Sequence, residues 1–290
     1  MFDLVVAYRI YPGISKVPAF YAHDKYKLSR MCLSSFRTSL GGLRTKVYAI
    51  LDGCPPIYDE LFKEVLQDCE LEIIHTEKIG NLATFSLQID LLTKQTDAEI
   101  VYFAEDDYFY LPNALEDMVA FMRANKDVDF VTPYDHPDSY FTSSRHERHQ
   151  LRPYGDRYWR TASSTCLTFL TTRRTLVFTA RMFRTYSAGN MDCPIWLALT
   201  QRSELANIRV HFSSWFRTRT WLKSWRWGVQ QILLNRRYLL WAPLPALGTH
   251  MESTCLAPLI DWESIFSAAE KIMQSGDPFT LKAGTSSYGI

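Results

Sequence analysis

The stretch YFAEDDYFYLPNALE, residues 102–116, places three adjacent carboxylates between two apolar segments. These carboxylates are Glu105, Asp106 and Asp107, and aromatic residues stand on both sides of them. Like charges repel one another and resist burial unless a cation balances them. The cation that this pattern predicts is Mg²⁺ or Mn²⁺, which takes oxygen ligands and shares its shell with substrate phosphates. The alternative is a solvated turn at the end of a strand.

Short apolar runs alternate with helical patterns through the first 133 residues. We expect strands at 4–10, 46–51, 71–75, 99–104 and 129–132, with helices between them. This alternation predicts βαβ units, and therefore an α/β fold with a mostly parallel sheet covered by helices on both faces. Ligands of open α/β sheets bind at the carboxyl ends of the strands, where the acidic triplet lies. The same edge should receive Tyr8, Arg9, Asp52, Gly80 and Asn81.

The overall composition excludes several classes of protein. Hydrophobic residues make up 47% and charged residues 22%, as in soluble globular proteins, and the net charge of +1 gives no general attraction to nucleic acid. The six cysteines are scattered without a C-x-x-C pair, which favours reduced thiols over disulfides or a zinc site. No apolar run is long enough to span a bilayer. We expect a cytoplasmic protein, with the inner face of the membrane as an alternative.

The second half of the chain has a looser pattern. Residues 134–157 predict a long loop that contains RHERH (145–149), and we favour a lid or acceptor loop there over a metal site. A strand at 166–171 and helices at 176–183 and 195–200 come next. The end of the chain predicts a helical extension.

The segment WFRTRTWLKSWRWG, residues 215–228, interleaves basic residues with tryptophans, and residues 205–247 contain no acid. One interpretation is a helix whose tryptophans pack on the core while its arginines face water. A second is peripheral contact with an anionic membrane. Nucleic acid is the third and the least favoured, because the overall charge is nearly balanced.

The order of strand, EDD, aromatic residue and proline-started helix resembles the DxD-like segment of GT-A glycosyltransferases, in particular family-2-like inverting enzymes. Further positions fit over roughly residues 3–200, with one beyond them. They are Asp52 in LDG, Gly80-Asn81 before a helix, Asp192 in GNMDCPIW and, late in the chain, His250 in PALGTHMES. Many relatives carry Asp-x-Asp-Asp, where this chain has Ala104, so which acid touches the metal stays open.

The resemblance implies a role for each residue. Asp107 would ligate Mn²⁺ or Mg²⁺, with His250 closing on the metal or the diphosphate. The nucleotide would be bound by Tyr8, Arg9, Asp52, Asn81, Glu105 and Asp106. Asp192 would be the catalytic base, although it could instead only cap a helix. Asp52, His250 and Arg9 could likewise be ordinary turn, loop and surface residues.

The resemblance thus implies a metal-dependent inverting hexosyltransferase-type enzyme that uses a UDP-, GDP- or dTDP-sugar. Its acceptor would be a hydroxyl of a glycan, a lipid-linked sugar or a lipopolysaccharide-type molecule, as in polysaccharide biosynthesis. Three parts of the chain are expected: residues 1–133 as the nucleotide-sugar-binding half, 134–204 as the acceptor-binding part, and 205–290 as a basic and aromatic extension. The alternatives are a nucleotidyltransferase acting on sugar phosphates and a non-catalytic carbohydrate- or membrane-binding module.

Overall fold

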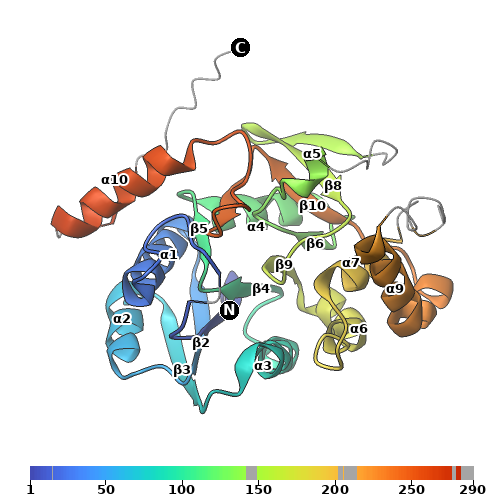
Figure 1. The fold of residues 1–290 in the computed structure, drawn as a ribbon, viewed down its shortest axis with the longest axis horizontal. Helices are drawn as coiled ribbons and strands as arrows, with labels where there is room; N and C mark the ends of the chain where they lie inside the picture. Colours follow the sequence, from blue (N-terminus) through green and yellow to red (C-terminus); the bar gives the residue numbers. More distant parts are fainter. Residues whose placement is uncertain (15, 142–148, 202–204, 206–213, 276–278, 282–290) are drawn as a thin grey trace.

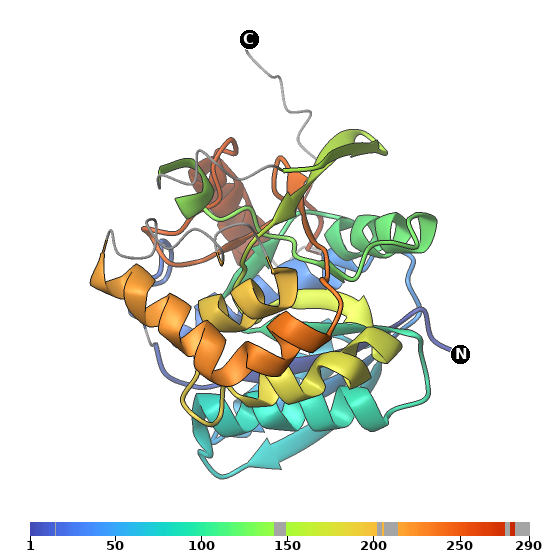
Figure 2. The ribbon, with the colours of Figure 1, turned by 90° about the vertical axis from the view of Figure 1, so that its right-hand side faces the viewer.

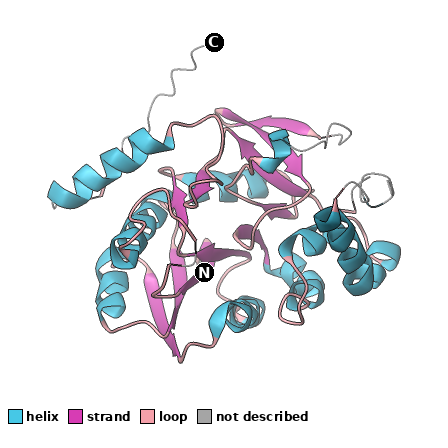
Figure 3. Cartoon of the chain, viewed as in Figure 1, coloured by secondary structure: helices cyan, strands magenta, loops and turns pink. Residues whose placement is uncertain are grey.

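The computed structural model describes residues 1–14, 16–141, 149–201, 205, 214–275 and 279–281 (Figure 1). The strands are β1 Leu4–Ile10, β2 Thr45–Asp52, β3 Glu70–Thr76, β4 Ile100–Glu105, β5 Tyr108–Tyr110, β6 Phe130–Val131, β7 Leu151–Tyr154, β8 Arg157–Ala162, β9 Phe169–Thr172, β10 Leu240–Leu244 and β11 Gly248–His250. The helices are α1 Lys25–Ser39, α2 Ile57–Val65, α3 Gly80–Lys94, α4 Ala114–Ala124, α5 Asp138–Phe141, α6 Arg173–Arg184, α7 Asp192–Thr200, α9 Trp215–Leu234 and α10 Trp262–Ser275 (Figure 3).

Nine strands form one central sheet in the order β3-β2-β1-β4-β9-β6-β10-β8-β7. The first four of these are mutually parallel. β9 and β8 run against their neighbours, so the remaining strands all point the same way. The predicted α/β fold with a mostly parallel sheet is therefore confirmed, and the carboxyl ends of β1, β2, β3 and β4 meet at one edge.

Helices cover both faces of this sheet. Val6 and Tyr8 of β1 point into a core shared with α1, α2, α4 and α10. Val5 and Ala7 point into a second core under α3, α6 and α7. Alternate residues of a strand face opposite sides, so a run of apolar residues in β1 serves both cores. Figure 1 shows α1 and α2 on one side of β1 and β2, and α3 on the other.

The sequence did not predict β5, β7, β8, β10 or β11. β11 pairs antiparallel with β5, which places His250 opposite Tyr108. β10, from the predicted extension, lies inside the central sheet between β6 and β8. Residues 134–157, expected as a loop, include α5 and the first strand of the β7–β8 hairpin.

Candidate active site

Glu105, at the end of β4, forms an ion pair with Arg9, which lies opposite it on β1. Its other oxygen accepts a hydrogen bond of 2.7 Å from Thr168 Oγ1. Arg9 also donates to the side chain of Asn81 and, at 2.9 Å, to its carbonyl oxygen at the start of α3. Both oxygens of Glu105 are thus occupied, and the residue joins β1, β4 and the start of α3.

Asp106 is bound by Lys25 from the first turn of α1. The distance between Lys25 Nζ and Asp106 Oδ2 is 2.6 Å, and the backbone N–H of Tyr11 donates to the same oxygen at 3.2 Å. Burial raises the pKa of Asp106, and Lys25 opposes that shift without cancelling it. Because burial disfavours the ionised form, the carboxylate of Asp106 stays charged only with the help of the ammonium group beside it.

Asp107 lies in the turn between β4 and β5, beside His250. The pairing of β11 with β5 brings His250 Nε2 to 3.1 Å from Asp107 Oδ2. Burial would raise the pKa of Asp107, but the imidazole outweighs it and lowers the pKa to about 2. Burial lowers the pKa of His250, but the carboxylate of Asp107 raises it by more, so the pKa lies above its usual value. Asp107 Oδ1 is buried and has no hydrogen-bond partner among the described residues.

The pair of Asp107 and His250 fits a divalent cation. Two ligands in adjacent positions around one ion lie about 3 Å apart, since metal–ligand distances are about 2.1 Å, and Asp107 Oδ2 and His250 Nε2 are 3.1 Å apart. His250 Nδ1 already accepts the backbone N–H of Glu252 at 3.1 Å, so Nε2 is the nitrogen that would bind an ion, once it has lost the proton that it shares with Asp107. The unpartnered Oδ1 offers a further ligand atom.

Within the described ranges, no group of three or more His, Cys, Asp or Glu side chains converges as a metal site. An ion at Asp107 would therefore complete its shell with water and phosphate oxygens, as Mg²⁺ commonly does. The sequence led us to expect that such an ion balances all three acids. Instead the chain supplies one basic side chain to each acid, and these side chains come from β1, α1 and β11.

A small cavity opens beside Asp107 and His250. Lys16 and Lys25 stand in its wall together with Glu252. Lys16 Nζ lies 2.7 Å from a carboxylate oxygen of Glu252, whose backbone N–H binds His250. Ammonium groups of lysines are suited to binding the phosphates of a nucleotide.

Asp52, at the end of β2, accepts hydrogen bonds from the backbone that leads into α3. One carboxylate oxygen accepts from Thr76 Oγ1 at 2.8 Å and from the N–H of Ile79 at 2.7 Å. The other accepts from the N–H of Gly80 at 2.8 Å, where the backbone has a φ of +83°, a conformation that favours glycine. With 3% of its surface exposed, Asp52 caps α3 and faces no open space.

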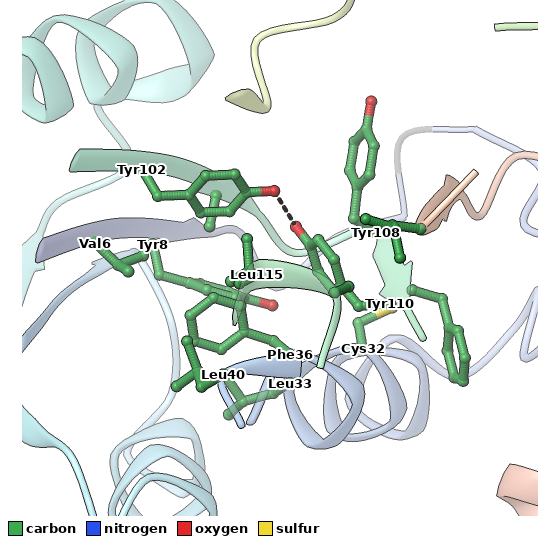
Figure 4. Packing of buried hydrophobic residues seen from close by; sticks show 14 of the residues in the cluster. Val6, Tyr8, Cys32, Leu33, Phe36, Leu40, Tyr102, Tyr108, Tyr110 and Leu115 are labelled. Atoms are coloured by element: carbon green, nitrogen blue, oxygen red, sulfur yellow. Dashed lines mark hydrogen bonds between the residues drawn. The ribbon is translucent and has the colours of Figure 1, made fainter. Parts of the chain in front are cut away.

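Tyr8 and Asn81, both predicted to bind the nucleotide, lie in different environments. The ring of Tyr8 is fully buried against Phe36 and Phe62, with centroid distances of 5.2 and 5.4 Å (Figure 4). Asn81 is exposed, and its amide nitrogen lies 3.3 Å from the hydroxyl of Tyr186. Asn81 can therefore meet a ligand, whereas Tyr8 supports the strand from the core.

Asp192 is the first residue of α7. Met191 is the N-cap residue, and no side-chain capping bond is formed there. The carboxylate of Asp192 accepts a hydrogen bond of 2.7 Å from the N–H of Cys193. The structure thus does not use Asp192 as the cap that the sequence offered as an alternative.

Asp192 belongs to the same part of the molecule as the acidic triplet. Burial raises the pKa of the Cys166 thiol, and three nearby carboxylates raise it further. These carboxylates are those of Asp192, Glu105 and Asp107. The charges of Arg9, Asp192 and Glu105 likewise act on the pKa of Tyr186, so this residue lies near all three.

Three residues of this region were not predicted from the sequence: Lys16, Lys25 and Tyr186. Lys25 directly follows the α1 N-cap residue Asp24, a place where a lysine commonly faces water. Tyr186 follows α6 in a run without any recognisable pattern. Nothing in the sequence around Lys25 or Tyr186 therefore indicates that these residues lie near the acidic triplet.

The segment 215–228 forms most of α9. Its tryptophans divide: Trp227 packs against the core beneath α6 and α7, whereas 78% of the surface of Trp215 is exposed. The core-packing interpretation therefore holds for one side of the helix. Of RHERH (145–149), all but His149 lies outside the described residues. In the described parts of the chain, no helix combines the length and apolar character needed to cross a bilayer.

Comparison with known sequences gives one family. The family described as "Glycosyl transferase family 2" matches residues 32–188, more than half of the chain. No curated protein matches significantly.

Solved structures resemble the chain only distantly. TarS from S. aureus, residues 1–349 with UDP, has a TM-score of 0.42 and 12% identity over 67% of this chain and 54% of that one. Another crystal structure of TarS 1–349 has a TM-score of 0.42 and 10% identity over 79% and 81% of the two chains. A mannosyltransferase from Pyrobaculum calidifontis with GDP-Man and Mn²⁺ has a TM-score of 0.34 and 14% identity over 45% and 35%. The chain thus spans about half the length of the first of these structures.

Proposed function

This chain belongs to glycosyl transferase family 2, and we propose that it is a metal-dependent, inverting glycosyltransferase. It transfers a sugar from a UDP-, GDP- or dTDP-linked donor to a hydroxyl group of a glycan, a lipid-linked sugar or a lipopolysaccharide-type acceptor. The observation that carries the proposal is the pair of Asp107 and His250 beside a lysine-lined cavity, in the same region as the carboxylate of Asp192.

Asp107 and His250 are the residues that hold the cation, Mn²⁺ or Mg²⁺. When bound, the cation acts as a Lewis acid that neutralises the charge developing on the departing nucleoside diphosphate. Lys16 and Lys25 attract the same phosphates from the wall of the cavity. Lys25 already lies against Asp106, so a donor that binds there meets a carboxylate for its ribose and an ammonium for its phosphates.

The other predicted nucleotide-binding residues have three different roles. Asn81 and Asp106 contact the nucleoside. Arg9 and Asp52 act as positioning residues, because the first fixes Glu105 and the second fixes the start of α3. Tyr8 contributes through packing in the core.

Asp192 acts as the general base. Its carboxylate takes the proton from the acceptor hydroxyl while that oxygen attacks the anomeric carbon and the bond to the diphosphate breaks. A base on the face opposite the leaving group gives inversion at that carbon, through a transition state with oxocarbenium character. The product glycoside should therefore have the anomeric configuration opposite to that of the donor.

The first test is a thermal-shift and donor-hydrolysis panel of UDP, GDP and dTDP nucleotides and their sugars, with and without Mn²⁺. We expect one nucleotide to raise the melting temperature only when Mn²⁺ is present. Asp107→Ala should lose that response, whereas the control Asp68→Ala, an exposed acid paired with Arg37, should keep it. A wild-type chain with no metal-dependent response to any nucleotide would contradict the proposal, and release of pyrophosphate would favour a nucleotidyltransferase instead.

A further inference from the structure

The outer side of α9 carries a regular stripe of exposed side chains. They recur every three or four residues and so share one face of the helix. The stripe consists of Trp215, Arg219, Leu222, Arg226, Val229 and Leu233. The stripe thus contains four apolar residues and two arginines along a helix of 20 residues, on the side where a soluble protein would normally place polar groups.

The apolar members of this stripe are strongly exposed. Trp215 exposes 78% of its surface and Leu233 exposes 64%, while Leu234 beside the stripe exposes 77%. Several large apolar side chains exposed on one helix commonly mark a site of interaction with a protein or a membrane.

Helix α6 extends the same surface. Arg181 of α6 donates a hydrogen bond of 2.7 Å to the side chain of Gln230 on α9, which holds the two helices side by side. On its exposed side α6 carries Val177 and Phe178, of which 50% and 66% are exposed. The stripe on α9 and these residues of α6 together are named the α6–α9 face.

The inner side of α9 is fixed to the body of the protein. A side chain at Gly228 would bring its Cβ to 2.6 Å from the Cβ of Ala198 on α7, so the two helices are in close contact. Lys223 Nζ donates at 2.6 Å to the carbonyl of Gly189, in the loop that precedes Asp192. Figure 2 shows α9, in orange, at the front of the molecule, on the side that faces the viewer.

The charge of this face has one sign. Neither α6 nor residues 205–247 contain an acidic residue. Burial lowers the pKa of Lys223, and the positive charges of Arg219 and Arg226 lower it further, which indicates a concentrated positive potential. A partner for this face must therefore offer both negative charge and an apolar layer.

We propose that the α6–α9 face docks on the surface of an anionic lipid membrane. Lipid headgroups supply the negative charge for the arginines, and the boundary with the acyl chains accepts Trp215, Leu222 and Leu233. A second copy of the chain is disfavoured because a symmetric contact would bring the arginines of both copies together without acids to pair them. Nucleic acid has no layer into which the aliphatic side chains could be buried.

The proposal is tested by co-sedimentation of the full chain with vesicles. We expect binding to vesicles of equal parts phosphatidylglycerol and phosphatidylcholine, weaker binding at high salt, and no binding to phosphatidylcholine alone. Arg219→Gln with Arg226→Gln should weaken the binding by roughly 30-fold, since each basic residue near the surface contributes about 1 kcal/mol. The control Lys63→Gln with Lys126→Gln makes the same charge change at exposed positions on α2 and after α4, and should bind like the wild type.

A second variant tests the apolar part of the face. Trp215→Ser with Leu233→Ser should weaken the binding at least about 10-fold at either salt concentration, because it removes buried apolar area and no charge. All these side chains are exposed, so the melting temperature should stay that of the wild type. Failure of the wild type to bind anionic vesicles, or equal binding by the arginine variant and its control, overturns the proposal. So does a lipid-free dimer that the Trp215→Ser, Leu233→Ser variant dissociates.

Discussion

The ends of β2 and β4 both carry carboxylates at the same edge of the sheet, but their oxygens are used differently. Asp52 accepts three hydrogen bonds from Thr76, Ile79 and Gly80, and every one of them stabilises the path into α3. Asp107 pairs with His250 through one oxygen and leaves the other without a partner among the described residues.

The difference arises from the path of the chain beyond each strand. At the end of β2 the acid lies beside the turn between β3 and α3, and the backbone N–H groups of Ile79 and Gly80 in that turn point towards it. After β4 it makes a tight turn into β5, whose partner β11 presents a side chain instead of backbone donors. Glu105 resembles Asp52 in this respect, because both of its carboxylate oxygens already have partners. Asp192 accepts the backbone N–H of Cys193 with one oxygen and is the proposed base. Changes to the two kinds of acid should have separable effects.

The largest effect is expected from Asp192→Asn. The amide cannot accept the proton of the acceptor hydroxyl, so the rate of sugar transfer should fall by roughly 10²–10⁴-fold, the usual contribution of a general base. Binding of the donor, measured by calorimetry with Mn²⁺, should remain close to that of the wild type.

The control for this prediction is Asp261→Asn, which changes another acid near the start of a helix, one whose carboxylate binds Ser264. It should leave transfer unchanged. If Asp192→Asn transfers sugar as fast as this control, Asp192 has only a structural role.

The next effect is on stability and concerns an acid with both oxygens occupied. Arg9→Met leaves Glu105 largely buried without its cation, which should lower the free energy of unfolding by about 3 kcal/mol. The measurement is urea unfolding followed by circular dichroism. Most of the loss should be recovered in the double variant Arg9→Met, Glu105→Gln, because the unpaired charge is then absent. A double variant no more stable than Arg9→Met would show that Arg9 acts through contacts other than this ion pair.

Much of the fold could be predicted because the first half of the chain repeats a simple pattern. The strand predicted at 4–10 has those bounds in the structure, and a helix, α2, lies between the strands predicted at 46–51 and 71–75. Continuous apolar runs and helical spacing are local properties of the sequence, so they can be recognised without knowledge of the tertiary contacts.

The missed strands show where local patterns end. β11 has three residues and owes its existence to its pairing with β5, a contact across more than 130 residues. The β7–β8 hairpin did carry a signal, since Gly155 and Asp156 form a two-residue turn between strands. The flanking strands, however, lack a regular alternation of apolar and polar residues, so the local pattern indicates a loop.

The gathering of acids at the ends of the strands was predicted, but the partners of these acids were not. The acids after β4 were identified from their unusual density, yet Lys25 looked like any charged residue at the start of a helix. Which acid is occupied and which is available depends on neighbours such as His250 and Gly80, which the fold brings to the strand ends. A list of acids at strand ends therefore overestimates the number of ligand contacts.

The smallest effect, and the sharpest separation of the two strand ends, is expected from Asp52→Asn. The substitution keeps one oxygen acceptor but turns an amide donor towards the backbone N–H of either Ile79 or Gly80. An unsatisfied buried N–H costs about 1–3 kcal/mol, so the free energy of unfolding should fall by that amount. The exposed control Asp68→Asn should change it by less than about 0.5 kcal/mol. Nucleotide affinity, measured below the unfolding transition with Mn²⁺, should stay that of the wild type, because Asp52 acts on the backbone. A loss of affinity without a loss of stability would instead place Asp52 against the nucleobase, and the two strand ends would then be alike.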